Sequence, residues 1–210
     1  GRIADIQGRK RILKYGTIIY TISSLLSAIS PSATALISFR VLQGIGGAMI
    51  YCTGIAILTS VFPISERGKA LGLSVAATYI GLSLGPPLGG LLTQQLGWRS
   101  IFFINAPLGL AVTATVLWKL RGEWAEAKGE KFDLTGSIIY GLSLIALMYG
   151  LSLIPAMLGV WLIVIGILGI LAFIRWETRM ESPILNIDLF RNNTAFAFSN
   201  LTALIHHSAI

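Results

Sequence analysis

Residues 134–174 read LTGSIIYGLSLIALMYGLSLIPAMLGVWLIVIGILGILAFI, 41 residues without a charged side chain. A membrane-spanning helix needs about 20 consecutive apolar residues, since each adds about 1.5 Å and the hydrocarbon layer is about 30 Å thick. The stretch is therefore long enough for two spans, and Ile154-Pro155 near its middle marks the turn between them. The pattern predicts a hairpin of two helices, 134–152 and 157–174.

Five more uncharged stretches occur, at 15–39, 41–65, 70–98, 100–118 and 192–210. Lipid offers the backbone no hydrogen-bond partners, so only helices and closed β-barrels cross it. Barrel strands would alternate apolar and polar residues over about ten positions, and these continuous runs do not. We therefore expect an all-α membrane protein with six complete spans and the start of a seventh. Besides the hairpin, the expected helices are 12–29, 34–60, 70–93, 101–118 and a last one beginning near 195.

The composition points to the same class of protein. Apolar residues make up 54% of the chain and charged residues 12%, whereas charged residues are about 25% of a soluble domain. These proportions exclude a soluble globular domain.

The net charge of +7 is unevenly distributed along the chain. If the spans cross alternately, one set of connecting segments holds 14 of the 16 basic residues. These segments are 1–14, 63–69, 119–133 and 175–191. The opposite set holds only Arg99, and Arg40 lies inside a span. This is the positive-inside pattern. We therefore expect a multi-pass protein of the plasma membrane, with residues 1–11 and 119–133 facing the cytoplasm and no nucleic acid as a partner.

The first cytoplasmic segment, 1–11, reads GRIADIQGRKR. We expect a tight turn between two spans, because Gly8 permits backbone conformations that other residues avoid. Asp5 can pair with the basic cluster or with a helix N-terminus. The alternative is a generic basic connector. The candidate site residues of this segment are Gly1, Asp5, Gly8, Arg9 and Lys10.

Arg40 lies inside the helix expected at 34–60. Gln43, Gly44 and Gly47 follow it at i+3, i+4 and i+7, so the four residues share one helix face. At the helical rise per residue, Arg40 is about 10 Å inside the outer end of the helix. A charge in a span costs at least about 2.5 kcal/mol unless it faces a polar interior, so Arg40 and Gln43 are candidate functional residues. The alternative is a structural arginine that snorkels or bonds to backbone carbonyls.

The helix expected at 70–93 contains GLSLGPPLGG at positions 81–90. Its glycines recur every four residues and predict a flat groove into which another helix can pack closely. Its prolines remove backbone donors and should bend the helix. Plain helix packing is the alternative to a functional motif. The candidate residues are Gly81, Gly85, Pro86, Gly89 and Gly90.

Three further polar residues of the expected spans are candidates for a functional role. Asn105, His206 and His207 are candidate polar residues of a pore, and one histidine could act as a proton relay instead of packing as a plain polar residue. Cys52, the single cysteine, is expected to be buried. No ligand spacing predicts a metal or a cofactor. Residues 81–85 fit the Gly-x-Ser-x-Gly pattern of hydrolases, but all nine acids lie outside the spans, so a membrane-embedded enzyme is the weakest alternative.

Five strings resemble motifs of the major facilitator superfamily of transporters. They are residues 1–11, 36–48, 65–72, 81–90 and 97–109. The first is similar to the loop between helices 2 and 3 of that family, although Ile6 stands where a basic residue is usual. The resemblance implies that Asp5 and Arg9 help to latch the two halves of a transporter. It also implies that Arg40 takes part in proton transfer and that residues 81–90 belong to the fifth helix of an exporter.

The extra hairpin resembles the fourteen-helix drug:proton antiporter branch of the family, which implies a partial major facilitator-type helical bundle. The implied domain map is residues 1–11 as the cytoplasmic loop between helices 2 and 3, 12–118 as helices 3–6 of the N-terminal half, 119–133 as a cytoplasmic loop, 134–174 as inserted helices 7–8, 175–194 as a cytoplasmic loop and 195–210 as the start of helix 9.

The implied function is secondary active export of drugs or other hydrophobic compounds, coupled to protons through alternating access. The expected partners are a small-molecule substrate, protons and the lipid bilayer, and the full-length protein is expected to be monomeric. The alternative is a carrier of metabolites, sugars or siderophore-like solutes. The sequence starts without a methionine, inside a basic turn, and stops partway through an expected helix, so we expect this chain to be an internal fragment. Because no span contains an acid, the resemblance implies that the proton-coupling carboxylate lies elsewhere in the protein.

Overall fold

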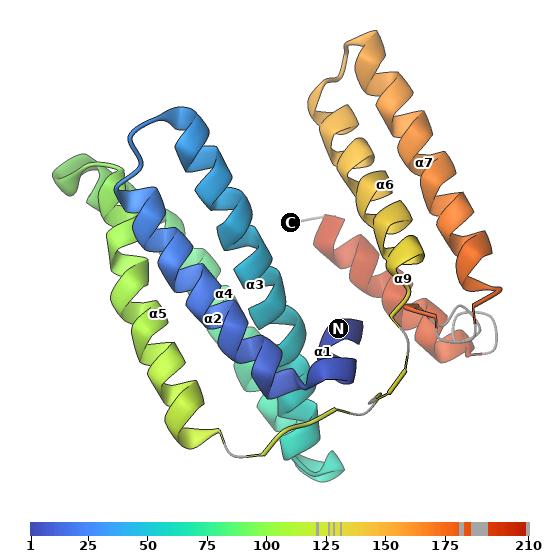
Figure 1. The fold of residues 1–210 in the computed structure, drawn as a ribbon, viewed down its shortest axis with the longest axis horizontal. Helices are drawn as coiled ribbons and strands as arrows, with labels where there is room; N and C mark the ends of the chain where they lie inside the picture. The colour runs from blue at the N-terminus through green and yellow to red at the C-terminus, as the bar shows by residue number, and fades with distance from the viewer. Residues whose placement is uncertain are drawn as a thin grey trace. The chain divides into compact units, whose positions relative to one another are not determined.

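The computed structural model describes residues 1–120, 122–125, 127, 129–130, 132–180, 183–185 and 193–208. Every regular element in these residues is a helix, and the chain divides into two compact units, 1–129 and 130–210. Figure 1 shows the helices with the labels used below. The prediction of an all-helical fold is confirmed for the described part of the chain.

The first unit is built around α2. Its helices are α1 (Arg2–Gln7), α2 (Arg9–Ala28), α3 (Ala33–Val61), α4 (Ile64–Leu96) and α5 (Arg99–Lys119). α2 packs along both α3 and α5, whereas α4 makes only marginal contacts with α3 and α5 and has no buried residue. Figure 1 shows α2 lying between α3 and α5. The core of this unit is therefore the bundle of α2, α3 and α5.

Glycines allow α2 and α3 to approach closely. A Cβ atom on Gly46 of α3 would lie 2.7 Å from the backbone N of Tyr20 on α2. A Cβ atom on Gly16 of α2 would lie 3.1 Å from the carbonyl O of Gly46. Both distances are shorter than ordinary van der Waals contact, so this crossing requires residues without a side chain.

α2 is more polar than the other long helices of the first unit. Its early residues include the basic side chains Arg9, Lys10, Arg11 and Lys14. Five of its hydroxyl groups donate to carbonyl oxygens three or four residues earlier in the helix, those of Thr17, Thr21, Ser23, Ser24 and Ser27. These bonds satisfy groups that would be costly to bury without a partner.

This polarity affects which helices meet the length and hydropathy of a membrane span. Among the described helices, five are long and apolar enough to cross a membrane, namely α3, α4, α5, α6 and α7. The sequence predicts six complete spans, and α2 is the one that composition does not support. Its basic start and its hydroxyl groups lower its hydropathy, and the hydroxyl groups lie buried against its neighbours.

The first residues are more helical than the predicted loop 1–11. Arg2–Gln7 form α1 and α2 begins at Arg9, so only Gly8, with φ of +110°, separates the two helices. Asp5 lies in the first turn of α1, where an acidic side chain favours the helix. A positive φ is open mainly to glycine. Gly8 is thus the turn, as predicted, while the extent of the loop is corrected.

Other boundaries are shifted for similar reasons. α4 begins at Ile64 directly after Pro63, six residues before the predicted start at 70, and Glu66 lies in its favourable first turn. The charges at 66–69 limit the apolar span but not the helix. α4 also continues through both of its prolines. The remaining long helices begin and end within three residues of their predicted bounds.

The second unit contains α6 (Leu134–Ser152), α7 (Met157–Glu177) and α9 (Thr194–Ser208). The predicted hairpin of α6 and α7 is confirmed, and its turn includes a cis peptide bond between Ile154 and Pro155. Near the turn, a Cβ atom on Gly159 would lie 2.7 Å from the carbonyl O of Gly150. The two helices are therefore in backbone contact at this end.

The other end of the hairpin is joined by Asp133. Its Oδ1 accepts a hydrogen bond from the backbone N of Gly136 (2.9 Å) and so caps α6. Its Oδ2 accepts a hydrogen bond from Nε1 of Trp176 on α7 (2.9 Å). A single carboxylate therefore caps one helix and fastens it to the next.

Candidate functional site

A chain of hydrogen bonds joins Arg40 on α3 to α2. Arg40 Nη1 donates to Gln43 Oε1 (2.6 Å), and Gln43 Nε2 donates to Ser24 Oγ (2.6 Å). Ser24 Oγ in turn donates to the carbonyl O of Tyr20 (2.7 Å). Gln43 is 3% exposed, so its amide is held inside the bundle. The structure brings Arg40 and Gln43 together as their spacing predicts.

The guanidinium of Arg40 contacts neutral partners in the described part of the chain. Its Cζ lies 5.6 Å from the centre of the Phe102 ring on α5, within cation–π range. Among the described residues, no carboxylate pairs with Arg40, and its side chain is exposed. It follows Ala33, the first residue of α3, by seven positions and so lies about 10 Å along the helix. Arg40 is therefore a cation inside a span that can accept an anionic partner.

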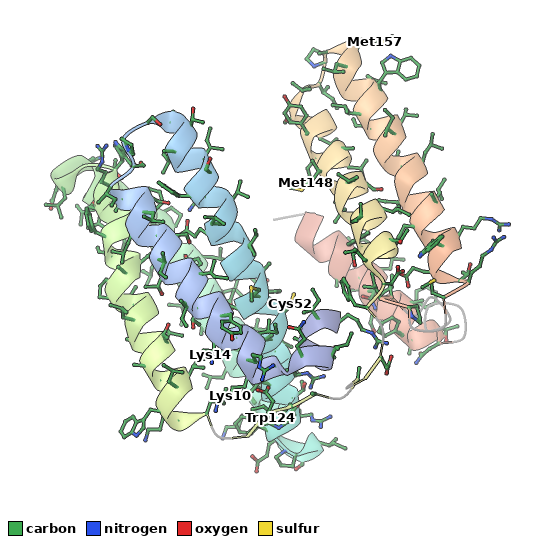
Figure 2. The ribbon with its side chains drawn as sticks, in the orientation of Figure 1. Lys10, Lys14, Cys52, Trp124, Met148 and Met157 are labelled. Atoms are coloured by element: carbon green, nitrogen blue, oxygen red, sulfur yellow. The ribbon has the colours of Figure 1, made fainter. Side chains whose placement is uncertain are left out.

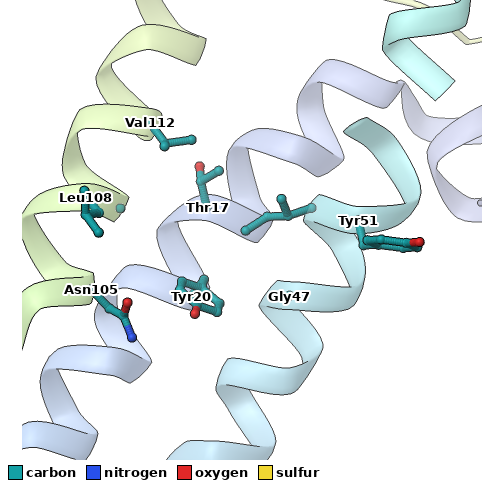
Figure 3. A pocket seen from close by; sticks show the side chains of 9 residues that line it. Thr17, Tyr20, Gly47, Tyr51, Asn105, Leu108 and Val112 are labelled. Atoms are coloured by element: carbon teal, nitrogen blue, oxygen red, sulfur yellow. The ribbon is translucent and has the colours of Figure 1, made fainter. Parts of the chain in front are cut away.

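A pocket of about 360 Å³ lies between α2, α3 and α5. Its lining residues are Thr17, Tyr20, Gly47, Ile50, Tyr51, Asn105, Leu108, Gly109 and Val112. Figure 3 shows Asn105 on α5 and Tyr20 on α2 near one end of the pocket. The lining is mostly apolar. Asn105, predicted as a polar pore residue, supplies an amide to it.

The pocket and the hydrogen-bond chain are neighbours. Tyr20 belongs to both, because its ring lines the pocket and its carbonyl O accepts from Ser24. Gly47 follows Gln43 by one helical turn and leaves room for the Tyr20 ring, whose carbon atoms would lie 3.9 Å from a Cβ at that position. Of the glycines predicted to share this face, Gly44 borders open space. The glycine that touches α2 closely is Gly46.

Arg9 anchors the junction between α1 and α2. Its Nε donates to Asp5 Oδ1 (2.8 Å), and its Nη1 donates to Ser60 Oγ (2.5 Å) and to the carbonyl O of Ala56 on α3 (3.4 Å). Arg9 is 7% exposed. Gly1 is the N-cap of α1. Asp5 and Arg9 are thus paired with each other, and a latch between two halves of a transporter stays a prediction.

The segment after α5 folds back onto this junction. The backbone N of Arg9 donates to the carbonyl O of Trp124 (2.8 Å), and the backbone N of Ala127 donates to the carbonyl O of Asp5 (3.0 Å). Figure 2 shows Lys10 and Trp124 at the same end of the first unit. Segments 1–11 and 119–133, which the charge pattern assigns to one side of the membrane, therefore touch each other.

Glu123 caps α2 from this segment. α2 has Gly8 as its N-cap and no side-chain cap of its own. Glu123 Oε1 accepts a hydrogen bond from the backbone N of Lys10 (2.9 Å), the second residue of the helix. A carboxylate at a helix N-terminus is favoured by the helix dipole. A Cβ atom on Gly8 would lie 2.5 Å from the Glu123 carboxyl group, so the glycine is also needed for space.

The glycine motif of α4 has no neighbour in the described part of the chain. A Cβ atom on any of its four glycines would meet no atom within 4 Å. The predicted groove against another helix therefore stays a prediction. The residues concerned are Gly81, Gly85, Gly89 and Gly90, with Pro86 inside the same helix.

The remaining candidates contribute less to the site. His206 and His207 belong to α9, but their side chains lie outside the described residues. Cys52 is exposed rather than buried, because no described helix covers its face of α3. Among the described residues, no group of three or more His, Cys, Asp or Glu side chains is arranged to hold a metal ion. The acids Glu126, Glu181 and Asp188 also lie outside the described residues.

Sequence reasoning missed three residues of this arrangement. Ser24 forms a polar stripe with Thr17 and Thr21 at i, i+4 and i+7, so the periodicity of α2 contained a signal for it. Gly46 stands in a run of glycines from which spacing alone does not select it. Glu123 carries no local signal, because its role depends on how the loop after α5 folds.

Comparison with known proteins identifies relatives over nearly the whole chain. A family model described as Major Facilitator Superfamily matches residues 1–199. "Multidrug resistance protein Stp" of Mycobacterium tuberculosis is 32% identical over 95% of this chain and 38% of its own length. "Multidrug resistance protein 3" of Bacillus subtilis is 31% identical over 98% of this chain and 41% of its own length.

A further relative is named as a transporter of a single compound. "Riboflavin transporter RibZ" of Clostridioides difficile is 29% identical over 96% of this chain and 44% of its own length. The chain thus spans about two fifths of the length of these curated relatives.

Proposed function

Because this chain belongs to the major facilitator superfamily, we propose that its protein is a proton-coupled exporter of drugs or other hydrophobic compounds. The family and the names of the relatives support a membrane transporter rather than an enzyme. Export is supported by the names of the multidrug resistance relatives. Proton coupling and alternating access are inferred from Arg40 and its hydrogen-bond partners.

The observation that carries the proposal is the cation inside α3. Arg40 lies within an apolar span and is held by Gln43, which is itself held by Ser24. A charge in a span is costly and therefore marks a functional path. A guanidinium near a carboxylate favours the ionised form of that acid. Arg40 would thus promote release of a proton from a carboxylic acid that approaches it. When the guanidinium and the carboxylate separate, the carboxylate would take up a proton again.

The acid must come from another part of the protein. All nine acidic residues of this chain lie at the ends of the helices or in connecting segments. The chain spans about two fifths of its relatives, and alternating access places sites between two helical halves. We therefore place the proton-binding carboxylate outside this chain.

The pocket between α2, α3 and α5 fits the proposed substrate class. Its volume of about 360 Å³ is within the range of about 300–1,000 Å³ that small-molecule sites occupy. The rings of Tyr20 and Tyr51 and the amide of Asn105 would orient a flat apolar compound. Residues 1–11 with 119–133 would close the cytoplasmic end, with Asp5 and Arg9 in the latch.

A metabolite carrier is the second candidate. It is favoured by the relative named as a riboflavin transporter. The two candidates differ in substrate and share the transport cycle. Competition of dye efflux by riboflavin would favour the second.

The test uses inverted membrane vesicles that contain the full-length protein. Energised vesicles should transport a lipophilic dye, and a protonophore should abolish this transport. Arg40→Ala should reduce proton-driven dye transport by at least about tenfold, because a loss of about 1.4 kcal/mol of coupling corresponds to that factor. Gln43→Leu should do the same through misplacement of Arg40.

The matched control is Arg175→Ala, which removes an exposed arginine of α7. It should leave transport within about twofold of the wild type, since exposed charges contribute little. Dye transport that persists fully in a folded Arg40→Ala protein would refute the coupling role. Transport that persists with the protonophore would refute proton coupling itself.

A further inference from the structure

A second pocket, of about 270 Å³, lies at the end of the first unit opposite the basic segments. It is formed by the turn between α2 and α3 and by the start of α5, which lie together in Figure 1. Its lining residues are Ser30, Pro31, Ser32, Ala33, Leu36, Trp98 and Arg99. None of these residues takes part in the hydrogen bonds that join Arg40 to α2, and none lines the pocket of Figure 3.

Arg99 brings a cation to this pocket. Its Nη2 donates to the carbonyl O of Ser30 (2.9 Å), and its Cζ lies 4.5 Å from the centre of the Trp98 ring. A guanidinium has five N–H donors, and the structure pairs Arg99 with no carboxylate among the described residues. Donors of Arg99 are therefore left for a ligand in the pocket.

The position of Arg99 is unfavourable for its own helix. It is the first residue of α5, where the helix dipole disfavours a cation. None of the lining residues is acidic. In the described part of the first unit, the acids Asp5, Glu66 and Glu123 belong to the opposite end. Neither helix stability nor an ion pair explains the arginine here.

The N-terminus of α3 adds to the positive potential. α3 begins at Ala33 on the pocket wall, and Ser32 caps it by accepting a hydrogen bond from Ala35 N (3.2 Å). The remaining N–H groups of the first turn carry partial positive charge and favour anions.

Ser30 is an independent indication of a missing ligand. It is 2% exposed, and its buried Oγ has no hydrogen-bond partner among the described residues. Buried hydroxyl groups in proteins are normally hydrogen-bonded. Ser30 also lines the pocket, so a ligand seated there can accept a hydrogen bond from its hydroxyl group.

We propose that this pocket binds the phosphate group of an anionic ligand. Arg99 donates through its planar fork, which matches the oxygens of phosphate, and Ser30 and the first turn of α3 supply further donors. The ring of Trp98 and the side chain of Leu36 give the pocket an apolar edge at the end of a span, where tryptophan is typical of the membrane boundary. The ligand is the headgroup of an anionic phospholipid or a free phosphate ion.

The experiment measures lipid binding to the purified full-length protein by native mass spectrometry in detergent, with phosphatidylglycerol as the probe. Arg99→Gln should weaken the first binding event by about ten- to one-hundredfold, because it removes hydrogen bonds to a charged group. Ser30→Ala removes one neutral donor and should weaken it by about fivefold.

Lys119→Gln is the matched control. Lys119 ends the same helix at the opposite end, and its Nζ lies 4.5 Å from the centre of the Trp118 ring. The variant thus removes one positive charge and one cation–π contact without touching the pocket. Binding should change by less than about twofold, as expected of an exposed charge.

Added inorganic phosphate distinguishes the two sources. Lipid that stays bound in excess phosphate identifies a headgroup site, and lipid that is displaced identifies a free-phosphate site. Wild-type affinity for phosphatidylglycerol in both Arg99→Gln and Ser30→Ala would overturn the proposal. If Arg99→Gln does not yield a monodisperse protein, wild-type affinity in Ser30→Ala alone would overturn it, since this substitution removes a single oxygen.

Discussion

Gly46→Ala should weaken the packing of α2 on α3 more than any neighbouring glycine substitution. The new Cβ atom would lie 2.7 Å from the backbone N of Tyr20 and 2.9 Å from the carbonyl O of Gly16. Ordinary contact begins at 3.4 Å, so the helices must separate locally by 3.4 minus 2.7, or 0.7 Å. Both neighbours are backbone atoms, which cannot rotate away as a flexible side chain can.

The magnitude follows from a comparison with Gly44→Ala. Alanine gains about 1 kcal/mol of helix propensity over glycine at either position. At Gly44 nothing lies within 4 Å of the new atom, so only that gain applies. At Gly46 overpacking costs about 1–3 kcal/mol. The two variants should therefore differ by about 1–3 kcal/mol in free energy of unfolding, with Gly46→Ala the less stable.

The assay is unfolding of the purified full-length protein in mixed micelles, followed by fluorescence as dodecyl sulfate is added. Gly47→Ala is a second control, because its nearest contacts are ring carbons of Tyr20 at 3.9 Å. It should behave like Gly44→Ala. Equal unfolding midpoints for Gly46→Ala and Gly44→Ala would refute the inferred close crossing of α2 and α3.

Two further variants probe the ends of the helices. Glu123→Ala should destabilise the start of α2 by about 1 kcal/mol, since it removes the carboxylate that caps this helix. Faster hydrogen exchange at residues 9–12 would confirm this, and unchanged exchange would contradict it. Trp176→Phe should lower the stability of the hairpin by about 1 kcal/mol. Asp133→Asn should destabilise a protein that already carries Trp176→Phe by less than it destabilises the wild type. Full additivity of the two losses in stability would contradict the hydrogen bond between Trp176 and Asp133.

Much of the fold follows from the spacing of charges. The hairpin of α6 and α7 has the predicted start and turn because no charge interrupts residues 134–174 and a proline stands between the helices. Helix ends beyond the apolar runs were harder to place. A charged residue such as Glu66 can lie outside the apolar layer of the membrane and still be part of a helix. α4 and α7 therefore extend past the predicted spans.

The site is partly predictable for a related reason. Arg40 and Gln43 are conspicuous because they are polar within a span and one turn apart, and the structure joins them. Glu123 and Arg99 act across long sequence separations, on Lys10 and Ser30 respectively. Such contacts depend on how loops and helices pack, which local periodicity does not encode.

The polarity of α2 has a consequence for how the protein enters the bilayer. A helix with a basic start and buried hydroxyl groups gains little from contact with lipid by itself. α3 offers it a complementary surface, with Gly46 against Gly16 and Gln43 against Ser24. We therefore expect α2 to be stably inserted only once α3 has emerged from the ribosome, so that the two helices partition into the membrane as a pair.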